Sequence, residues 1–344
     1  MICHLDARCL SGQRTGIGVF TAEVARCWPE ARLVHHVRAG QVGDRTHGRL
    51  WHLRTAAAVR REGGRYLSTD SLVVPVLLGR RATVVVHDLA PLEEAASHHW
   101  RARLFYRSLL RLACLRVGAV VVPTVATRDA LVRRHRRVGP KVHVAPEAPR
   151  ALPPAGAAPT AVRAPYVLHT GTHEPRKNVL ALVEAFLTRP VPEPWQLVLA
   201  GRAGWLAPAD AGRLDELVQG SQGRVVRLGF VADDVLAALY AGAALFAYPS
   251  SYEGFGLPVV EAMRAGVPVV TTDAAALVEV AGGAAHVVPL GPGLAARLGS
   301  ALAELAADPQ ARTELARRGA ARAAEFDWSR TARKVHAAVS STAA

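Results

Sequence analysis

The feature that most constrains the fold of this 344-residue chain is a repeated alternation of short β-branched runs with longer stretches of helical periodicity. Such alternation is typical of βαβ units, in which parallel strands form a sheet and helices cover both of its faces. The pattern stops between Ala145 and Pro165, where six prolines stand among many alanines, and then restarts. We therefore expect an α/β protein of two Rossmann-like, doubly wound domains that face a cleft.

The Pro-rich interruption sets the expected domain bounds. We expect an N-terminal domain over residues 1–150 and a C-terminal domain over 151–344, with a linker at about 145–165 and the last helix free to pack back on the N-terminal domain. The final segment Gly293–Ser340 predicts two helices separated near Asp308-Pro309. The expected strands are Thr83–His87, Ala119–Pro123, Tyr166–Thr170, Gln196–Ala200, Val225–Leu228 and Ala244–Pro249. The expected helices are Gly18–Cys27, Trp100–Val117, Val125–His135, Val179–Thr188 and Asp233–Ala241.

Composition excludes several other classes of protein. With 50% hydrophobic and 20% charged residues the chain is typical of a soluble globular protein and unlike a disordered one. The four cysteines form no C-x-x-C pair and have no companion histidine spacing, so neither a metal site nor a disulfide framework is expected. No run approaches the roughly 18 apolar residues of a membrane span, so we expect a cytoplasmic protein with reduced thiols.

The net charge of +14 is carried almost entirely by arginine and favours anionic partners. Two arginine-rich stretches, Trp100–Val117 and Arg133–Arg137, either contact anionic lipid at the inner membrane face or present a solvated face. Specific nucleic-acid binding is not expected, because only 6% of the residues are aromatic and no nucleic-acid-binding module is evident.

The most informative stretch is Ala247–Gly266, AYPSSYEGFGLPVVEAMRAG. An apolar strand is followed by a Gly-rich loop, Pro258 suits the first helical position, and Gly266 suits the stop. A helix N-terminus beside a glycine is a phosphate site, because its backbone amides lack partners within the helix. The amides expected to be free are those near Gly256, Leu257 and Val259.

Two carboxylates lie in the same stretch. Glu261 is placed to accept two hydroxyls of a vicinal diol such as ribose, and Glu253, in the preceding loop, addresses another part of the same ligand. The alternative makes Glu261 an ordinary first-turn acid and Glu253 a solvated loop residue. A second stretch, GTHEPRKN, places Arg176 and Lys177 between a strand and a helix. Two cations there suit a diphosphate, and plain surface charge is the alternative.

The N-terminal half offers weaker candidates. Gly16 and Gly18 lie between a short strand and a helix, but Thr21 stands where a dinucleotide fingerprint needs its third glycine, so only a Gly-rich turn that lets backbone approach a ligand is expected. His87 and Asp88 end a strand, where the histidine either binds a sugar hydroxyl or forms a structural pair with the aspartate.

Taken together, these stretches resemble the retaining glycosyltransferases of family 4, which have the GT-B fold. DAR, RTGIGVF, VVVHDLAPL, VVPTVATRDAL, YVLHTGTHEPRKN, LVLAG, LGFV, YPSSYEGFGLPVVEAMRAGVPVV and AAEFDWSRTA follow the family order over most of the chain. The two glutamates of EGFGLPVVE are its most specific element, and the overall pattern is most similar to mannosyltransferase-type members.

The resemblance implies a metal-independent enzyme without a cofactor that moves a hexose from a nucleotide diphosphate sugar to an acceptor hydroxyl with retention of configuration. Glu261 would bind the ribose and Glu253 the transferred sugar, with His87 and Asp88 contacting that sugar from the N-terminal domain. The groups implied at the diphosphate are Arg176, Lys177, the amides around Gly256 and Leu257, and the loop of Gly16 and Gly18.

Two departures make the acceptor the least defined element. The usual Asn-Gly-Val-Asp at the linker entry is replaced by Ala145-Pro-Glu-Ala-Pro149, and Arg38–Gly64 matches little. A glycan, a lipid-linked sugar and a natural product remain open as acceptors, and the base, the sugar and the oligomeric state are open as well. The competing hypotheses are a catalytically silent nucleotide-sugar-binding accessory protein of another transferase, a nucleotide-sugar epimerase and a nucleic-acid-binding protein.

Overall fold

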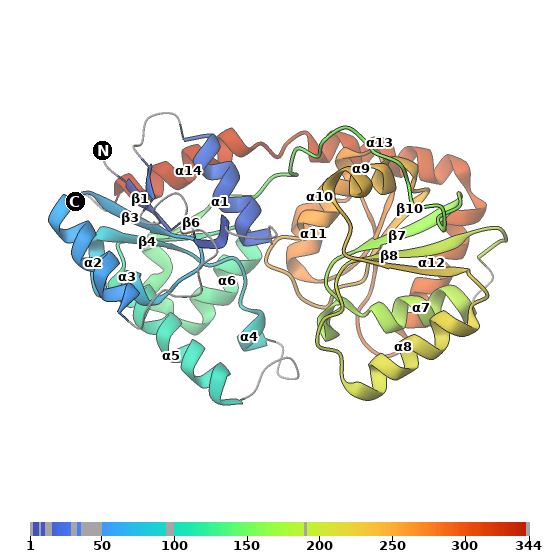
Figure 1. Cartoon of the computed structure of the whole chain (residues 1–344), viewed down its shortest axis with the longest axis horizontal. Coiled ribbons are helices and arrows are strands. Elements are labelled where there is room, and N and C mark those ends of the chain that lie inside the picture. Colours follow the sequence, from blue (N-terminus) through green and yellow to red (C-terminus); the bar gives the residue numbers. More distant parts are fainter. Residues whose placement is uncertain are drawn as a thin grey trace. The chain divides into compact units, whose positions relative to one another are not determined.

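The structure is a computed structural model that describes residues 3–6, 8–10, 16–28, 33–35, 50–93, 100–188 and 191–341. The chain divides into two compact units, each treated separately below. Unit 1 consists of the described residues within Met1–Glu93, His98–Ala148 and Phe326–Ala344, and unit 2 of those within Pro149–Glu325. Each unit is a parallel sheet with helices on both faces (Figure 1), as the alternating pattern of the sequence predicts.

Unit 1 has a six-stranded parallel sheet in the order β2-β1-β3-β4-β5-β6. Its strands are β1 (Cys3–Leu5), β2 (Leu33–His35), β3 (Arg65–Ser68), β4 (Ala82–Val85), β5 (Ala119–Val122) and β6 (Val142–Val144). Its helices are α1 (Gly16–Arg26), α2 (Trp51–Glu62), α3 (Val73–Leu78), α4 (Ala90–Glu93), α5 (Trp100–Arg116), α6 (Val125–Arg134) and α14 (Trp328–Ser341). The strand order reverses between β1 and β3.

Helix α14 follows unit 2 in the sequence but packs in unit 1 beside α1 (Figure 1). Trp328 is 5% exposed, and its ring lies edge-on to Phe20 with 6.0 Å between the centroids. The Thr331 hydroxyl donates to the Pro146 carbonyl at 2.5 Å. These contacts attach the end of the described chain to the first sheet.

The prediction of two helices over Gly293–Ser340 is wrong, because three are present. A break between Ala323 and Trp328 divides the second predicted helix. Its physical reason is Asp327, whose carboxylate accepts the Arg330 backbone N–H at 2.9 Å and so caps the start of α14.

Unit 2 has a six-stranded parallel sheet in the order β12-β11-β10-β7-β8-β9, the 3-2-1-4-5-6 arrangement of dinucleotide-binding folds read from the other edge. Its strands are β7 (Tyr166–Thr170), β8 (Gln196–Ala200), β9 (Val225–Gly229), β10 (Leu245–Tyr248), β11 (Val269–Thr272) and β12 (His286–Val288). Its helices are α7 (Val179–Thr188), α8 (Pro208–Gly220), α9 (Asp233–Gly242), α10 (Leu257–Arg264), α11 (Ala275–Ala281), α12 (Leu294–Ala307) and α13 (Pro309–Ala323).

The central strands of unit 2 are buried on both faces. Along β10, Leu245 and Ala247 join a core with α7 and α12, while Phe246 and Tyr248 join a second core with α9 and α10. A large apolar side chain contributes about 1.5–3 kcal/mol when it is fully buried, so these two cores fix the register of the strands that end at the site. Tyr248 also carries a hydroxyl to the carboxyl end of the sheet.

Several boundaries in unit 1 differ from the prediction by one or two residues, and two of these differences concern candidate site residues. Strand β4 ends at Val85 and not at His87, because Asp88 accepts the Ala90 N–H at 3.0 Å and starts helix α4 there. Helix α1 begins at Gly16, two residues before its predicted start, so both glycines of the expected turn are helical.

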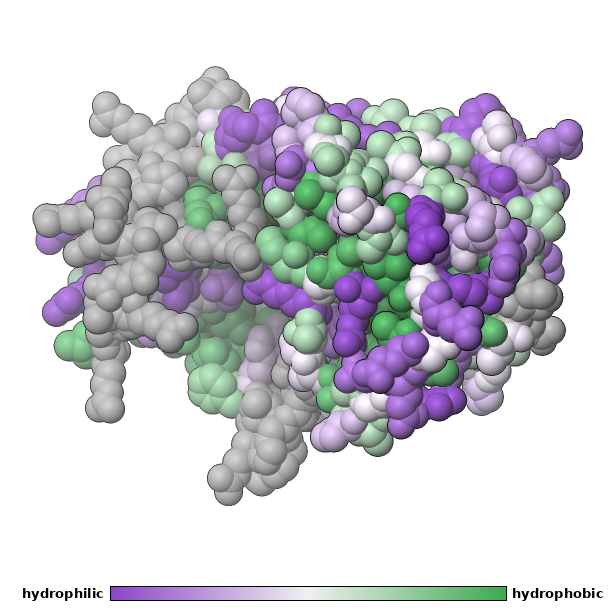
Figure 2. Space-filling view, turned by 45° about the vertical axis from the view of Figure 1, so that its right-hand side comes forward, coloured by the Kyte–Doolittle hydropathy of each residue, from purple (hydrophilic) through white to green (hydrophobic). Residues whose placement is uncertain are grey.

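Figure 2 shows hydrophilic and hydrophobic residues interspersed over the coloured part of the face that it presents. Within the part of the chain that the structure describes, no helix has both the length and the apolar character needed to cross a membrane.

Candidate functional site

The candidate site of unit 2 lies where its strand order reverses, between β7 and β10. Ligands of open α/β sheets bind at such a point, outside the carboxyl ends of the strands. The loop after β7 carries Arg176 and Lys177, and the loop after β10 carries Glu253. The structure thus brings Glu253 together with two predicted site residues that lie more than seventy positions before it in the sequence.

Glu253 pairs with both cations. Its Oε2 lies 2.8 Å from Nη1 of Arg176, and its Oε1 lies 2.5 Å from Nζ of Lys177. The Lys177 ammonium also donates to the Tyr248 hydroxyl and lies 4.5 Å from the centroid of that ring. Lys177 is 6% exposed and Glu253 9% exposed, so the alternative readings of these two as surface charge and solvated loop are wrong.

The cluster holds Glu253 as an anion. Burial would raise the pKa of this carboxyl, but Lys177 and Arg176 outweigh burial and lower the pKa to about 2. Burial lowers the pKa of Lys177, an effect that Glu253 partly offsets. Arg176 also pairs with Glu174 at 2.8 Å, so two cations and two carboxylates leave the cluster formally neutral. A diphosphate here would have to share or displace these contacts.

Hydrogen bonds to backbone carbonyls hold the two loops of the cluster together. Nδ2 of Asn178 donates to the Pro249 carbonyl at 2.8 Å, and the Ser251 N–H donates to the Arg176 carbonyl at 2.8 Å. Asn178 has a left-handed φ of 51°, which asparagine tolerates better than most residues. The loops are therefore a preformed part of the unit.

Gly256 precedes α10 with a φ of 100°, and a Cβ there would lie 2.6 Å from Cδ2 of Leu277, so this position requires glycine. Pro258 is the second residue of α10 and not the first as predicted, and the helix ends at Arg264, before Gly266. The expectation of a free amide at Val259 is wrong, because its N–H donates to the Gly256 carbonyl at 2.9 Å.

The backbone N–H of Leu257, the first residue of α10, is available to a ligand. Over the described part of the chain, no acceptor takes it. It is the amide at the start of α10 that can meet a ligand.

Glu261 lies in the second turn of α10 and is 6% exposed, so the reading as an ordinary first-turn acid is wrong. Its Oε1 accepts from Nε of Arg150 at 2.7 Å, and its Oε2 accepts from the Tyr240 hydroxyl at 3.1 Å. Arg150 also donates from Nη1 to Asp233 at 3.0 Å. Burial raises the pKa of Glu261, although Arg150 and Tyr240 oppose this rise.

The sequence analysis missed Arg150, Tyr240 and Tyr248. Arg150 is an isolated charge in a Pro-rich segment, and that was the one available signal. The two tyrosines look like ordinary apolar positions of a helix and a strand.

In unit 1, His87 is held at both ring nitrogens. Nδ1 lies 3.1 Å from Glu147 Oε1, and Nε2 lies 3.1 Å from the Thr69 carbonyl. A neutral imidazole donates from one ring nitrogen only, so the tautomer decides to which of the two partners the ring donates. Asp88 caps α4, and Phe20 packs edge-on against His87 at 4.9 Å. Glu147, which is 5% exposed, is a further residue that the sequence analysis missed.

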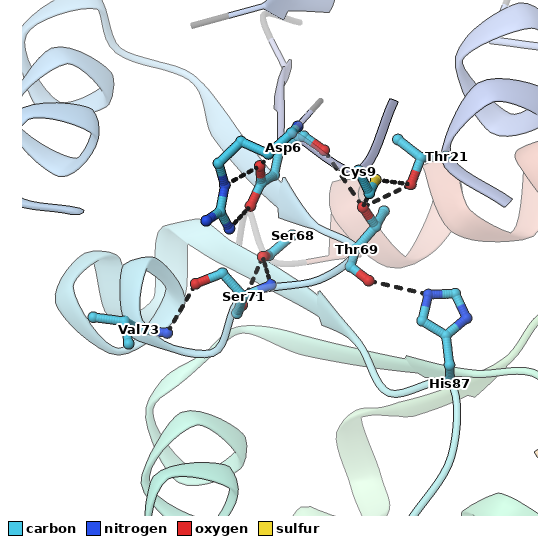
Figure 3. A network of polar contacts seen from close by, with 9 residues as sticks. Asp6, Cys9, Thr21, Ser68, Thr69, Ser71, Val73 and His87 are labelled. Carbon is cyan, nitrogen blue, oxygen red and sulfur yellow. Dashed lines mark hydrogen bonds and ion pairs between the residues drawn. The ribbon is translucent and has the colours of Figure 1, made fainter. Parts of the chain in front are cut away.

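The point where the strand order of unit 1 reverses carries a network of polar contacts (Figure 3). The Thr21 and Thr69 hydroxyls lie 2.8 Å apart, and Sγ of Cys9 lies 3.1 Å from Thr21 Oγ1. Thr21 thus has a structural use at the position where a dinucleotide fingerprint has its third glycine. Gly16 is exposed at the start of α1 and Gly18 is buried within it, which corrects the expected turn, and residues 11–15 lie outside the described part.

Comparison with known proteins identifies the region around the cluster. Residues 164–308 match the family model of the group 1 glycosyl transferases. The O-antigen chain mannosyltransferase B of Escherichia coli is 38% identical over 167 residues, which are 47% of this chain and 42% of that protein. The O-antigen chain mannosyltransferase RfbU of Salmonella typhimurium is 25% identical over 64% of this chain and 60% of its own length. The chain thus spans less than two thirds of these curated relatives.

A likeness in structure extends further than these matches in sequence. HepE of Anabaena, solved in complex with UDP and glucose, superposes with a TM-score of 0.76 at 22% identity over 99% of both chains. At this identity the likeness shows the fold, which is the GT-B fold predicted from the sequence. Residues 164–308, which hold the charge cluster of unit 2, therefore match the group 1 glycosyl transferases within a chain that has the GT-B fold.

Proposed function

We propose that this chain is a glycosyltransferase that moves a hexose of the mannose or glucose type from a nucleotide diphosphate sugar to an acceptor hydroxyl. The observation that carries the proposal is the buried Arg176, Lys177 and Glu253 cluster at the strand-order reversal of a group 1 glycosyltransferase domain. Two relatives are named as O-antigen chain mannosyltransferases, and HepE was solved with UDP and glucose. We propose a glycan, lipid-linked or natural-product acceptor, of which the O-antigen chain named for two relatives favours the glycan.

In this proposal Arg176 and Lys177 stabilise the diphosphate, whose charge grows as its bond to the sugar breaks. The Leu257 N–H beside Gly256 contacts a phosphate oxygen, and Glu261 accepts the ribose hydroxyls. Two fixed cations and a helix N-terminus supply the stabilisation that the leaving group needs, so we propose a reaction without a metal or cofactor.

Unit 1 is proposed to contribute the remaining contacts to the donor. Gly18 is buried within α1, so Gly16 alone is proposed for the diphosphate, and His87 with Asp88 for the transferred sugar, on the strength of the family pattern. Since both ring nitrogens of His87 already have partners, a sugar hydroxyl would take the place of one of them.

We propose that the configuration at the anomeric carbon is retained. Glu253 is a weak nucleophile, because each of its oxygens is held by a cation and its pKa lies near 2. The acceptor oxygen then attacks on the face that the diphosphate leaves: its bond to the anomeric carbon forms, the bond to the β-phosphate oxygen breaks, and the acceptor proton passes to that phosphate oxygen.

The test is a thermal-shift screen of the purified protein with UDP-, GDP-, ADP- and dTDP-linked sugars, followed by measurement of nucleoside diphosphate release with and without acceptor. A ligand at about 100 times its dissociation constant adds about 2.7 kcal/mol of stability. Release that Glu253→Gln abolishes, with a product whose anomeric proton coupling matches the donor, supports a retaining enzyme. Binding without release would favour the accessory protein, and no binding of any donor would refute the proposal.

We further propose that unit 1 contacts anionic membranes through α5. Leu104 and Phe105 are 56% and 68% exposed on this helix, beside the exposed Arg107 and Arg111. Besides burial, Arg111 and Arg107 lower the pKa of His135, so α5 lies next to the second arginine-rich stretch. Exposed apolar side chains among arginines suit the surface of an anionic bilayer.

Flotation with phosphatidylglycerol vesicles tests this contact. Binding that weakens in Phe105→Ser and at high salt is expected. Failure of the protein to float with these vesicles would remove the membrane proposal without touching the enzymatic one.

A further inference from the structure

Arg150 lies in the segment that leads from β6 into unit 2, and it anchors that segment on Glu261. Its Nε lies 2.7 Å from Glu261 Oε1, and its Nη1 lies 3.0 Å from Asp233 Oδ1. The side chain of Arg150 is 22% exposed and that of Glu261 only 5% exposed. The contact is therefore a partly buried, charge-assisted hydrogen bond between residues 111 positions apart in the sequence.

The arrangement leaves Glu261 with spare acceptor capacity. An ionised carboxylate offers about four lone-pair sites. Arg150 occupies one on Oε1 and the Tyr240 hydroxyl occupies one on Oε2. The two that remain, one on each oxygen, match the two hydroxyls of a vicinal diol, provided that the carboxyl stays charged.

We propose that Arg150 is a positioning residue for the nucleotide, which holds Glu261 as an oriented anion whose free lone pairs accept the ribose hydroxyls. The inference rests on the proposed function and names the residue that prepares its ribose site. Without Arg150 the carboxyl would face low-dielectric surroundings with no cation beside it and only the Tyr240 hydroxyl as a donor, and a protonated carboxyl accepts fewer hydrogen bonds.

Three groups in the described part of the chain act on the charge of Glu261. Arg150 comes from the connecting segment, and Tyr240 and Asp233 come from α9. Burial and Asp233 raise the pKa of Glu261, whereas Arg150 and Tyr240 lower it. Removal of Arg150 therefore moves protonation of Glu261 to higher pH, and the ribose contact should weaken as the pH falls.

The experiment measures the dissociation constants of UDP and GDP, and of their 2′,3′-dideoxy forms, by calorimetry at pH 8 and pH 6. The wild type should prefer the nucleotide that carries the diol. Arg150→Gln should weaken binding of that nucleotide by about tenfold or more, since a charged hydrogen bond contributes about 1.5–3 kcal/mol, with a larger loss at pH 6 than at pH 8. The dissociation constant of the dideoxy nucleotide should differ by less than about twofold between Arg150→Gln and the wild type. We count a difference of that size as no effect.

Two further variants test whether the charge and the position of Arg150 are responsible for these effects. Arg150→Lys should restore part of the preference for the diol, because it keeps the charge but loses the fixed fork. Arg213→Gln removes an exposed arginine that pairs with Glu216 elsewhere in unit 2, and it should leave every constant unchanged.

The outcomes separate the inference from the function on which it rests. Tighter binding of the diol nucleotide by Arg150→Gln would show that Arg150 competes with ribose, and equal weakening of both nucleotides would show a merely structural residue; each overturns the inference. An unchanged preference in Arg150→Gln, together with a lost preference in Glu261→Gln, refutes the role of Arg150 alone. A wild type that binds none of UDP, GDP, ADP and dTDP refutes this inference together with the proposed function.

Discussion

Replacement of Glu253 by glutamine tests the charge cluster of unit 2 through its effect on stability. The pKa of Glu253 falls from its ordinary value of 4.5 to about 2 in the folded chain. At about 1.4 kcal/mol for each pKa unit, the charged form contributes about 3 kcal/mol at pH 7. Because the folded pKa is depressed, this contribution is complete above pH 4.5 and is lost as the pH falls through 2.

Burial lowers the pKa of Lys177, which means that it disfavours the charged lysine. The whole cluster therefore contributes less to the free energy of unfolding than Glu253 does by itself. This offset is constant at acidic and neutral pH, where the lysine stays charged, so it does not change the predicted pH dependence. The difference in unfolding free energy between the wild type and Glu253→Gln should therefore shrink from about 3 kcal/mol at pH 7 to roughly half of that value at pH 3.

Urea unfolding from pH 7 to pH 3 measures this difference. The matched control is Glu314→Gln, which removes an exposed carboxylate that pairs with Arg317 on the surface of α13, and its difference should stay small at every pH. A difference for Glu253→Gln that does not depend on pH would refute the reasoning, because the two buried ion pairs would then contribute nothing through ionisation.

Three further predictions concern packing and hydrogen bonding. Gly256→Ala should destabilise unit 2 by about 1–3 kcal/mol, because the new Cβ meets Leu277 at 2.6 Å, whereas Gly266→Ala has a similar φ and open space and should cost less in the same thermal unfolding experiment. Trp328→Ala should destabilise unit 1 by about 3–5 kcal/mol, seen as faster amide hydrogen exchange in β5 and not in β7; uniform acceleration would contradict the packing of α14 in unit 1. Glu147→Gln should weaken the hold on His87 and cost about 1–3 kcal/mol, measured by denaturant unfolding with the ring followed by NMR; an unchanged ring signal would count against the contact.

Much of unit 2 could be predicted from the sequence. The bounds of β7, α7 and β8 agree with the prediction residue for residue. These elements combine unbroken apolar runs with clear turn signals, so local pattern and tertiary packing favour the same structure.

The site could be predicted where it depends on loops that follow strands. Arg176, Lys177 and Glu253 converge because parallel strands end at one edge, which the alternating pattern already implies. What sequence reasoning could not supply was the pairing within that edge: Glu253 neutralises both cations, and Arg150 reaches Glu261 from the Pro-rich segment. Such partners are selected by three-dimensional proximity and leave no periodic signal.

The last break between helices shows the same limit on a smaller scale. Asp327 caps α14 from within an Ala/Arg-rich stretch whose propensity favours one continuous helix. The cap and the burial of Trp328 prevail over that propensity, because the helix must leave unit 2 and pack in unit 1.

The placement of α14 also determines the order in which the two units can complete their folding during synthesis on the ribosome. Synthesis proceeds from the N-terminus, and domains generally fold as units during it. Unit 2 is contiguous over Pro149–Glu325 and has all of its strands once that stretch has emerged. Unit 1 emerges first but lacks the helix that buries Trp328, Val335 and Val339 until the end of the described chain has been made. The nascent chain therefore carries an open apolar face on its earliest part while its later part matures, and a ribosome that stalls before residue 328 would release a first unit that cannot close its own core.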